Sequence, residues 1–239
     1  MIPKVIHYCW FGKNPLPDSA KQCIASWKKY FPDYEIKEWN ESNFDIEMTA
    51  YTKEAYIAKK YAFVSDYARF WILYNYGGVY FDTDVEVVKD FTPILEKGAF
   101  LGWEKGVYLT GVNPGLGMAC DSGNTVLLEL LTLYNNMSFN AEYAKKDRKT
   151  ITEYTFDVLT RFGLKKQNRE QLIQGIYVYP SDYFCPVDVV TKRLHITDNT
   201  YSIHNYTASW NERTNKGLKK RLREVMPEWL LILLYKIKH

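Results

Sequence analysis

The sequence predicts an α/β fold in which helices flank a central sheet. Residues 4–10 and 34–39 are strand-like apolar stretches, and the segment between them has helical spacing at Ile24, Trp27 and Phe31. This strand–helix–strand opening is typical of an α/β layer. Farther along, residues 61–76 contain no Gly or Pro and predict a helix. The apolar run 79–81 then predicts a buried strand.

The remaining elements follow from the same patterns. Asp18 or Ser19 is expected to cap the first helix. Residues 113–117, Asn-Pro-Gly-Leu-Gly, must form a loop. Because we find no internal repeat and no low-complexity linker, we expect a single domain. Further helices are predicted at 49–60, 125–134 and 152–162, and further strands at 85–88, 99–103, 107–112 and 175–179.

The helix predicted at residues 61–76 has a core-facing aromatic stripe and one pair of opposite charges. Asp66 and Arg69 are i, i+3 neighbours and can form an ion pair. Such a pair is often a plain surface salt bridge, but a helix with aromatic residues on most sides is buried, and buried charges need a reason. Gly77 and Gly78 supply the helix end, since glycine accepts the left-handed conformation. The stripe consists of Phe63, Tyr67, Phe70 and Tyr74.

Two carboxylates follow the strand predicted at 79–81. Asp82 and Asp84 are two residues apart, and side chains at i and i+2 of an extended segment point the same way. We therefore expect both to face one cleft, where hard oxygen ligands suit a divalent cation. Helix, double glycine, strand and Asp-x-Asp form one unit that directs Asp66, Arg69, Asp82 and Asp84 at one region.

Three stretches in the right order resemble the family-32 glycosyltransferases, which include bacterial capsular-polysaccharide transferases and fungal α-mannosyltransferases. They are residues 2–12, residues 65–84 with their Ser-Asp-Tyr-Ala-Arg-Phe and Gly-Gly-Val-Tyr-Phe-Asp-Thr-Asp motifs, and residues 201–210. The sequence is also similar to the sugar-transferring domains of the large clostridial toxins. The resemblance spans nearly the whole chain. It implies a GT-A-like fold, a Rossmann-like single domain that binds nucleotide sugars on a central mixed sheet flanked by helices.

The resemblance also implies roles for individual residues. Asp82 and Asp84 would hold Mn²⁺ or Mg²⁺ on the donor diphosphate, with Asp84 as direct ligand and Asp82 also reaching the ribose or the sugar. Asp66 and Arg69 would bind the donor sugar, and Arg69 could also neutralise phosphate. Trp10 matches an aromatic residue that stacks on the nucleotide base, although a plain core tryptophan is an equal alternative.

The late stretch adds further candidate ligands. His204 is expected to bind the metal or the diphosphate, with Asn205 as the fallback ligand. Ser209 and Trp210 match a loop that closes over the diphosphate, although Trp210 could instead anchor the C-terminal region. We expect His7 to be a core or supporting residue. Where the family has a glycine-proline element before residue 155, this chain has Thr-Ile-Thr-Glu at 150–153, which leaves the contacts to sugar and acceptor there open.

Bulk properties predict a globular cytosolic protein. The net charge of +3 is too small to indicate nucleic-acid binding, and no apolar run approaches the ~20 residues that span a bilayer. The start of the chain has no signal-peptide pattern. The polar segment 135–149 is the best candidate for a mobile or acceptor-facing insertion. Four cysteines without metal-knuckle spacing are expected to be free and mostly buried thiols in a reducing compartment: Cys9, Cys23, Cys120 and Cys185.

The end of the chain differs in character from the rest. We place the transferase domain at residues 1–215 and a basic and apolar helix at 216–239, where lysines and arginines precede the run Trp-Leu-Leu-Ile-Leu-Leu-Tyr. Such a helix suits either an anionic membrane surface or packing on the domain or a second subunit. The first alternative predicts a peripheral protein on the inner face of the cell membrane.

The function we expect is a metal-dependent hexosyltransferase of surface-polysaccharide synthesis. Its donor would be a nucleoside diphosphate sugar, with uridine favoured over guanosine, and its acceptor a glycan or polyprenyl-linked sugar. Family resemblance implies retention of the anomeric configuration. Because no carboxylate nucleophile is evident in the sequence, we expect front-face attack by the acceptor hydroxyl.

Two other function classes fit part of the sequence. A haloacid-dehalogenase-type phosphatase has an apolar strand followed by Asp-x-Asp, and Asp82 would then be the nucleophile with Asp84 as acid/base. That motif should open its domain, however, and here some eighty residues precede it. A non-catalytic sugar-nucleotide-binding module is the second alternative. The presence of all four polar groups in the Asp66–Asp84 unit argues against it.

Overall fold

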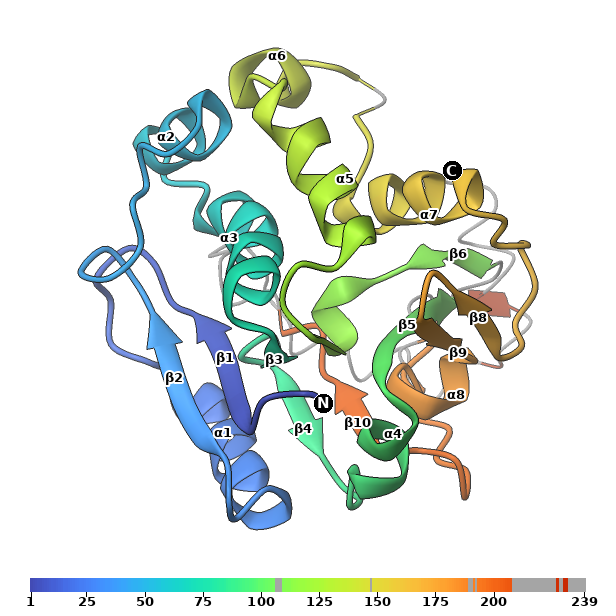
Figure 1. Cartoon of the computed structure of the whole chain (residues 1–239). Coiled ribbons are helices and arrows are strands. Elements are labelled where there is room, and N and C mark those ends of the chain that lie inside the picture. Colours follow the sequence, from blue (N-terminus) through green and yellow to red (C-terminus); the bar gives the residue numbers. More distant parts are fainter. Residues whose placement is uncertain are drawn as a thin grey trace.

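A computed structural model describes residues 1–105, 109–146, 148–188, 191, 193–207, 227 and 230–231. The described chain forms a central mixed sheet with helices on both sides, as the sequence predicts (Figure 1). The strand order is β2-β1-β3-β7-β5-β9-β8, with β6 paired to β5, and a separate two-stranded sheet joins β4 and β10. The expected domain boundary at residue 215 lies outside the described residues, and so does nearly all of the segment 216–239.

The N-terminal quarter is the predicted strand–helix–strand unit. Strand β1 (Val5–Cys9), helix α1 (Asp18–Tyr30) and strand β2 (Glu35–Trp39) follow one another, and β1 and β2 pair in parallel along their whole lengths. The predicted cap of α1 is wrong. Pro17 occupies the N-cap position with no side-chain cap bond, and Asp18 and Ser19 are already helical. Proline has no polar side chain that could accept a hydrogen bond from the first turn, so α1 begins without a side-chain cap.

Helix α3 (Tyr61–Tyr76) begins and ends at the predicted residues. Gly77 follows it with φ +64° and ψ −164°, a positive-φ backbone that favours glycine but differs from the left-handed helical cap that the double glycine predicts. In the predicted stripe, Tyr67 and Phe70 are fully buried, while Phe63 and Tyr74 are half-buried against the same core. The preceding helix α2 (Ala50–Ile57) starts with a capping box. Figure 1 shows α3 beside α5 on one side of the sheet, with α1 on the other.

Three short strands bring distant segments to one place. Strand β3 (Gly78–Tyr80) leads into the Asp82–Asp84 segment, and β4 (Val85–Val87) follows that segment directly. Strand β10 (Ser202–His204) pairs antiparallel with β4, so that His204 lies opposite Val85. The indole Nε1 of Trp27 in α1 donates to the Val85 carbonyl at 2.8 Å and holds β4 from the other side. A residue near the end of the described chain therefore lies next to Asp84.

The chain from residue 92 onward completes the sheet and its cover. The sequence did not predict β7, β8, α4 or α8, each of which has at most six residues and so gives little periodic signal. Segment 135–149 contains a short helix, α6, and Ser138 Oγ ties it to Glu54 of α2 at 2.7 Å. The elements are α4 (Thr92–Lys97), β5 (Ala99–Lys105), β6 (Leu109–Val112), the 3-10 turn η1 (Pro114–Leu116), β7 (Met118–Cys120), α5 (Thr125–Asn135), α6 (Phe139–Tyr143), α7 (Ile151–Arg161), β8 (Gln171–Ile173), β9 (Ile176–Tyr179) and α8 (Ser181–Phe184).

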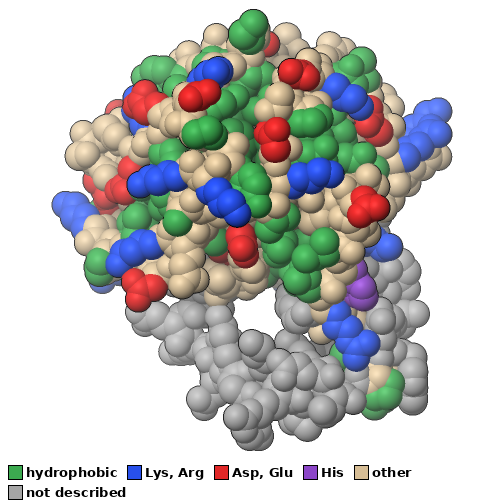
Figure 2. All heavy atoms as spheres, turned by 90° about the horizontal axis from the view of Figure 1, so that it is seen from below, with side chains coloured by type: hydrophobic (Ala, Val, Ile, Leu, Met, Phe, Trp, Pro, Cys, Tyr) green, Lys and Arg blue, Asp and Glu red, His purple; other side chains and the backbone are tan. Residues whose placement is uncertain are grey.

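The core of the described chain is rich in aromatic side chains. Trp27, Phe81 and Phe91 are among its fully buried members, and all four cysteines are free and buried, as predicted. On the face shown in Figure 2, basic and acidic side chains are interspersed with apolar ones. Among the described residues, no helix is long and apolar enough to cross a membrane.

Gly78, the first residue of β3, gives the first testable prediction. It has φ +101°, and a Cβ there would lie 2.7 Å from the Val5 carbonyl oxygen. Gly163 has a similar φ of +97° but open space around it. Replacement of Gly163 by alanine should cost about 1 kcal/mol of unfolding free energy from backbone strain, and Gly78→Ala about 3 kcal/mol, because the new methyl also displaces β1. Urea denaturation of the two variants measures the difference. Equal losses would contradict the close packing of Gly78 on β1.

Candidate functional site

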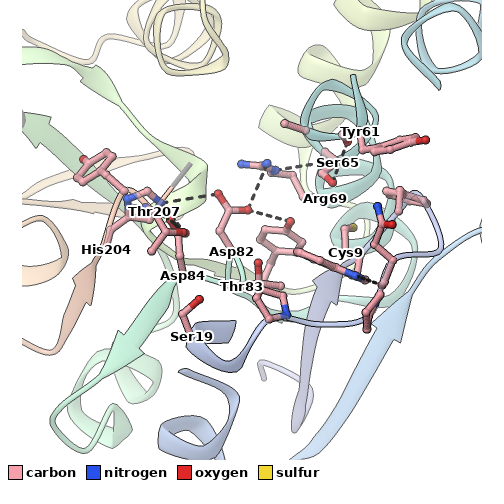
Figure 3. Close-up of a pocket in the computed structure, with 18 residues that line it drawn as sticks. Cys9, Ser19, Tyr61, Ser65, Arg69, Asp82, Thr83, Asp84, His204 and Thr207 are labelled. Atoms are coloured by element: carbon pink, nitrogen blue, oxygen red, sulfur yellow. Dashed lines mark hydrogen bonds and ion pairs between the residues drawn. The ribbon is translucent and has the colours of Figure 1, made fainter. Parts of the chain in front are cut away.

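A pocket of about 730 Å³ opens where the carboxyl ends of β1 and β3 meet α3 and β10 (Figure 3). Its lining comes from four separate parts of the chain, namely the end of β1 with the following loop, the first turns of α3, the segment after β3, and the end of β10. Their pocket-lining residues are Cys9, Trp10, Phe11, Asn14, Pro15, Pro17, Ser19, Tyr61, Ala62, Ser65, Arg69, Tyr80, Asp82, Thr83, Asp84, His204, Tyr206 and Thr207.

Asp82, Asp84 and His204 meet in this pocket. His204 Nε2 lies 3.2 Å from Asp84 Oδ1 and 3.9 Å from Asp82 Oδ2. One ligand atom from each of the three lies within 4.8 Å of the others. The two carboxylates converge as predicted, but for a different local reason. Val85 N donates to the Asp82 carbonyl at 3.0 Å, so residues 82–84 form a turn and not an extended strand.

Arg69 forms the predicted pair with Asp66 and also contacts the Asp-x-Asp motif. Its Nη2 lies 3.0 Å from Asp66 Oδ1 and 3.3 Å from Asp82 Oδ1. The Arg69 side chain is 5 % exposed, and its Nε donates to the Ser65 carbonyl at 3.1 Å. The Tyr80 hydroxyl donates to Asp82 Oδ1 at 3.0 Å. Figure 3 shows Asp82 between Arg69 on one side and His204 on the other.

The charges in the site shift one another's pKa values. Burial raises the pKa of Asp66 to about 6, because the cost of burying its charge exceeds the attraction of Arg69. Burial also opposes ionisation of Asp82, but Arg69, His204 and Tyr80 outweigh it and lower the pKa of that carboxyl. For His204 burial disfavours the charged ring, but Asp84 and Asp82 raise its pKa on balance. Asp82 is therefore held as a carboxylate.

The donor set fits a divalent metal ion. Two carboxylates and one imidazole are ligands that Mn²⁺ accepts, and Mg²⁺ prefers the oxygens. Asp84 is held in place from its other oxygen, since Thr207 N and Thr207 Oγ1 reach Asp84 Oδ2 at 2.9 and 3.2 Å. Its Oδ1 is then directed to the side where His204 lies. Asp82, Asp84 and His204 are the described residues that would hold such an ion.

The other predicted site residues lie in different places. Trp10 lines the pocket, and its Nε1 donates to the Asn14 carbonyl at 2.7 Å. Asp66 is not among the lining residues and contacts Arg69 from outside the pocket wall. Asn205 is exposed, and its Nδ2 donates to the Asp84 carbonyl at 3.2 Å, so its role as a ligand stays a prediction. Ser209 and Trp210 lie outside the described residues.

His7 is a core residue, one of the two alternatives that the sequence left open. Its Nε2 lies 3.0 Å from the Gly77 carbonyl, and its Nδ1 accepts from Trp39 Nε1 at 3.1 Å. Burial lowers the pKa of His7 to about 4, so the ring is neutral. His7 joins β1 and β2 to Gly77, the residue before β3, and is not among the pocket-lining residues.

Sequence analysis missed several residues that shape the site. Tyr80 and Thr207 contact the two aspartates directly. The loop at η1 reaches the same place, since a Cβ on Gly115 would collide with Asp82 Oδ2 and lie 3.3 Å from Arg69 Nη1. The sequence predicts that loop from its Asn-Pro-Gly composition, but no local signal tells which part of the fold it contacts.

Gly115 provides the second prediction, on the cation site. Gly115→Ala should push the Asp82 carboxylate away from His204 and weaken Mn²⁺ binding by about tenfold or more, as changes beside metal ligands do. Gly111→Ala is the matched control. Its Cβ would lie 2.7 Å from the Thr152 carbonyl, so it is crowded as well but lies outside the pocket lining. Titration of free Mn²⁺ by electron paramagnetic resonance gives both affinities. An equal affinity in the two variants would contradict the packing of Gly115 on Asp82.

Asp66 provides the third prediction, on pH dependence. Its pKa rises from 3.8 to about 6 on folding, so its contribution to stability is present below pH 3.8 and is lost as the pH rises through 6. Asp66→Asn has no carboxyl to ionise, so the variant does not lose stability in this way as the pH rises. Relative to the native chain, the variant should gain up to about 3 kcal/mol between pH 4 and 7.5. Urea denaturation at both pH values, with a chelator present, measures it. A stability difference independent of pH would show that Arg69 compensates the buried charge fully.

Comparisons with known proteins match a region that contains part of this site. Residues 17–101 match the family described as glycosyltransferase sugar-binding region containing DXD motif, and this range includes Asp66, Arg69, Asp82 and Asp84. Inositol phosphoceramide mannosyltransferase 1 of Schizosaccharomyces pombe is 31% identical over 111 residues, covering 42% of this chain and 33% of that protein. The uncharacterized glycosyltransferase L373 of Acanthamoeba polyphaga mimivirus is 26% identical over 230 residues, covering 88% of this chain and 84% of that protein.

Solved structures show the same fold. The PaToxG glycosyltransferase superposes with a TM-score of 0.51 at 22% identity, over 67% of this chain and 69% of that one. A glycosyltransferase involved in glycosylation of the major capsid of PBCV-1 gives 0.50 at 12% identity, over 86% and 95%. The chain spans only 33% of the length of mannosyltransferase 1 of Schizosaccharomyces pombe, and only 40% of inositol phosphoceramide mannosyltransferase 3 of the same fission yeast. Residues 17–101 are therefore similar to the DXD sugar-binding region of glycosyltransferases, and the chain has a GT-A-type fold.

Proposed function

We propose that the protein is a metal-dependent, retaining hexosyltransferase that uses a nucleoside diphosphate sugar. The observation that supports this most is the convergence of Asp82, Asp84 and His204 in the same pocket as Trp10 and Arg69. When bound there, a divalent cation stabilises the charge that develops on the departing diphosphate. The imidazole in the donor set favours Mn²⁺ over Mg²⁺.

The chain's own residues give the donor a position. Arg69 carries a guanidinium that Asp66 and Asp82 hold in place, so it can meet a sugar hydroxyl or a phosphate without rearrangement. Trp10 offers a half-buried indole to the nucleotide base, and its Nε1 is already used on Asn14. The base therefore meets the face of this ring. Uridine remains our expected base, with guanosine as the alternative.

Retention is what the family resemblance implies, and the carboxylates that line the pocket bear on how it would be achieved. Asp82 and Asp84 are the described lining residues with a carboxylate, and both are assigned to the cation. Asp82 is also paired with Arg69 and hydrogen-bonded by Tyr80, which makes it a poor nucleophile. We therefore expect the acceptor hydroxyl to attack from the same face as the leaving phosphate, to which its proton passes. A covalent glycosyl-enzyme adduct seen by mass spectrometry would contradict this.

The acceptor class is inferred from the relatives. The names of the fission-yeast proteins identify a phosphosphingolipid as what they mannosylate. A lipid-linked sugar, such as a polyprenyl-linked glycan, extends that chemistry to this chain. We place the reaction in surface-polysaccharide synthesis on the cytoplasmic face of a membrane, with residues 216–239 as the proposed membrane contact.

The fourth prediction tests the activity. Uridine and guanosine diphosphate hexoses are incubated with the protein, Mn²⁺ and a panel of polyprenyl-linked and glycan acceptors, and release of the nucleoside diphosphate is measured with and without chelator. One donor should turn over, and Asp84→Asn should lower its rate at least about 100-fold, because the leaving group loses its electrostatic stabilisation. Asp157→Asn, which removes a surface ion pair with Lys149, should leave the rate unchanged.

The opposite results are equally informative. Turnover that survives both chelator and Asp84→Asn would contradict the metal-dependent mechanism. Release of inorganic phosphate from a generic phosphoester, with no sugar donor used, would favour the phosphatase reading of Asp82 and Asp84. Metal-dependent binding of a nucleotide sugar without turnover on any acceptor would favour the non-catalytic module.

A further inference from the structure

The imidazole of His204 lacks the partner that usually orients a metal-binding histidine. Its Nε2 faces Asp82 and Asp84, while its Nδ1 is buried and has no hydrogen-bond partner among the described residues. Metal-binding histidines almost always donate from their second nitrogen to a carboxylate, a carbonyl or a water, which sets the rotation of the ring. Something else must hold the ring of His204.

Tyr206 makes the contact that can do this. Its ring centroid lies 4.2 Å from that of His204 with an interplanar angle of 76°, an edge-to-face arrangement. A rotation of the imidazole about the Cβ–Cγ bond of His204 would bring it against the Tyr206 ring. His204 and Tyr206 are two residues apart, and both line the pocket.

Tyr206 is itself anchored at both its hydroxyl and its backbone. The hydroxyl lies 3.1 Å from Cys185 Sγ, a buried thiol after α8. The backbone has φ +48°, which is uncommon for a residue other than glycine. The neighbouring residues hold it there, because Asn205 N donates to the Asp84 carbonyl and Thr207 N to Asp84 Oδ2, each at 2.9 Å. Backbone strain of this kind persists where surrounding contacts impose it.

We propose that Tyr206 is the positioning residue of His204, and that it orients Nε2 toward the cation by ring contact where other proteins use a hydrogen bond. The inference rests on the cation site of the proposed function. The strained turn 205–207 then has two functions. Its backbone holds Asp84, and the Tyr206 ring that it carries holds His204. Tyr206 need not touch the cation or the donor for this.

A double-mutant cycle with Mn²⁺ alone as the probe tests the inference. The variants are Tyr206→Leu, His204→Ala and the double variant, and Mn²⁺ affinity is measured by paramagnetic resonance of the free ion. Leucine removes the ring, and its backbone must adopt the same positive φ as that of Tyr206. We expect Tyr206→Leu to weaken binding about tenfold or more, the size found for residues that orient metal ligands. On the His204→Ala background the same change should alter the affinity less than about twofold, because its effect passes through His204.

Three further variants make the test specific. Tyr206→Phe keeps the ring and should stay within about threefold of the native affinity, since the hydroxyl acts only through its anchor. Tyr206→Asn removes the ring with a residue that tolerates positive φ, so it provides the cycle if the leucine variant does not fold. Tyr177→Leu removes a half-buried tyrosine of β9 outside the pocket and should leave the affinity unchanged.

Two outcomes would overturn this inference but leave the proposed function intact, and a third would overturn both. A native affinity in Tyr206→Leu and Tyr206→Asn would show that the ring does not orient His204. An equal loss with and without His204 would show that Tyr206 acts by another route. If the native chain and Tyr177→Leu bind no Mn²⁺, the cation site of the proposed function fails and this inference fails with it.

Discussion

The buried guanidinium of Arg69 is the interaction on which the site depends. Asp66 and Asp82 come from different elements, and Arg69 Nη2 reaches both at 3.0 and 3.3 Å. Without the guanidinium of Arg69 between them, the carboxylates of Asp66 and Asp82 would be buried without a positive partner, which costs several kcal/mol per charge. A buried ion pair seldom adds net stability over an apolar replacement. Its value here is positional, because it aims Asp82 into the pocket and keeps it ionised.

The other half of the site depends on a pairing between distant segments. Strand β10 pairs with β4, and this brings His204 to Asp84 across 120 positions of the chain. The turn after β10 then returns to Asp84 through Asn205 and Thr207. Asp82 is therefore held by α3 and β3, while Asp84 and His204 are held by the β4–β10 sheet. The cation would join these two supports, and donor binding would then depend on the integrity of the two-stranded β4–β10 sheet.

Local sequence signals predicted the parts of this site that depend on local structure. Helix α3 was predicted to the residue, because its lack of Gly and Pro and its Gly77 end are local signals. The convergence of Asp82 and Asp84 was predicted from strand geometry, yet a turn produces it, since spacing alone does not distinguish the two. Tyr206, Thr207 and Gly115 could not be found in this way. Each becomes part of the site only through pairing of β4 with β10 or packing of η1, and no local pattern encodes such contacts.

The charges of the site explain why the cation and the donor should bind together. At neutral pH the three carboxylates of Asp66, Asp82 and Asp84 outnumber the one guanidinium of Arg69. Positive charge on His204, whose pKa Asp84 and Asp82 raise, would offset only part of that excess. A diphosphate would be repelled from such a pocket. A divalent cation cancels that excess, and the site then presents a metal ion and a guanidinium to an incoming anion. Because Asp66 has a pKa of about 6, mild acid removes one of these negative charges and weakens the attraction for the cation. In the proposed function, this ionic balance, more than any single contact, would make the metal a condition for donor binding.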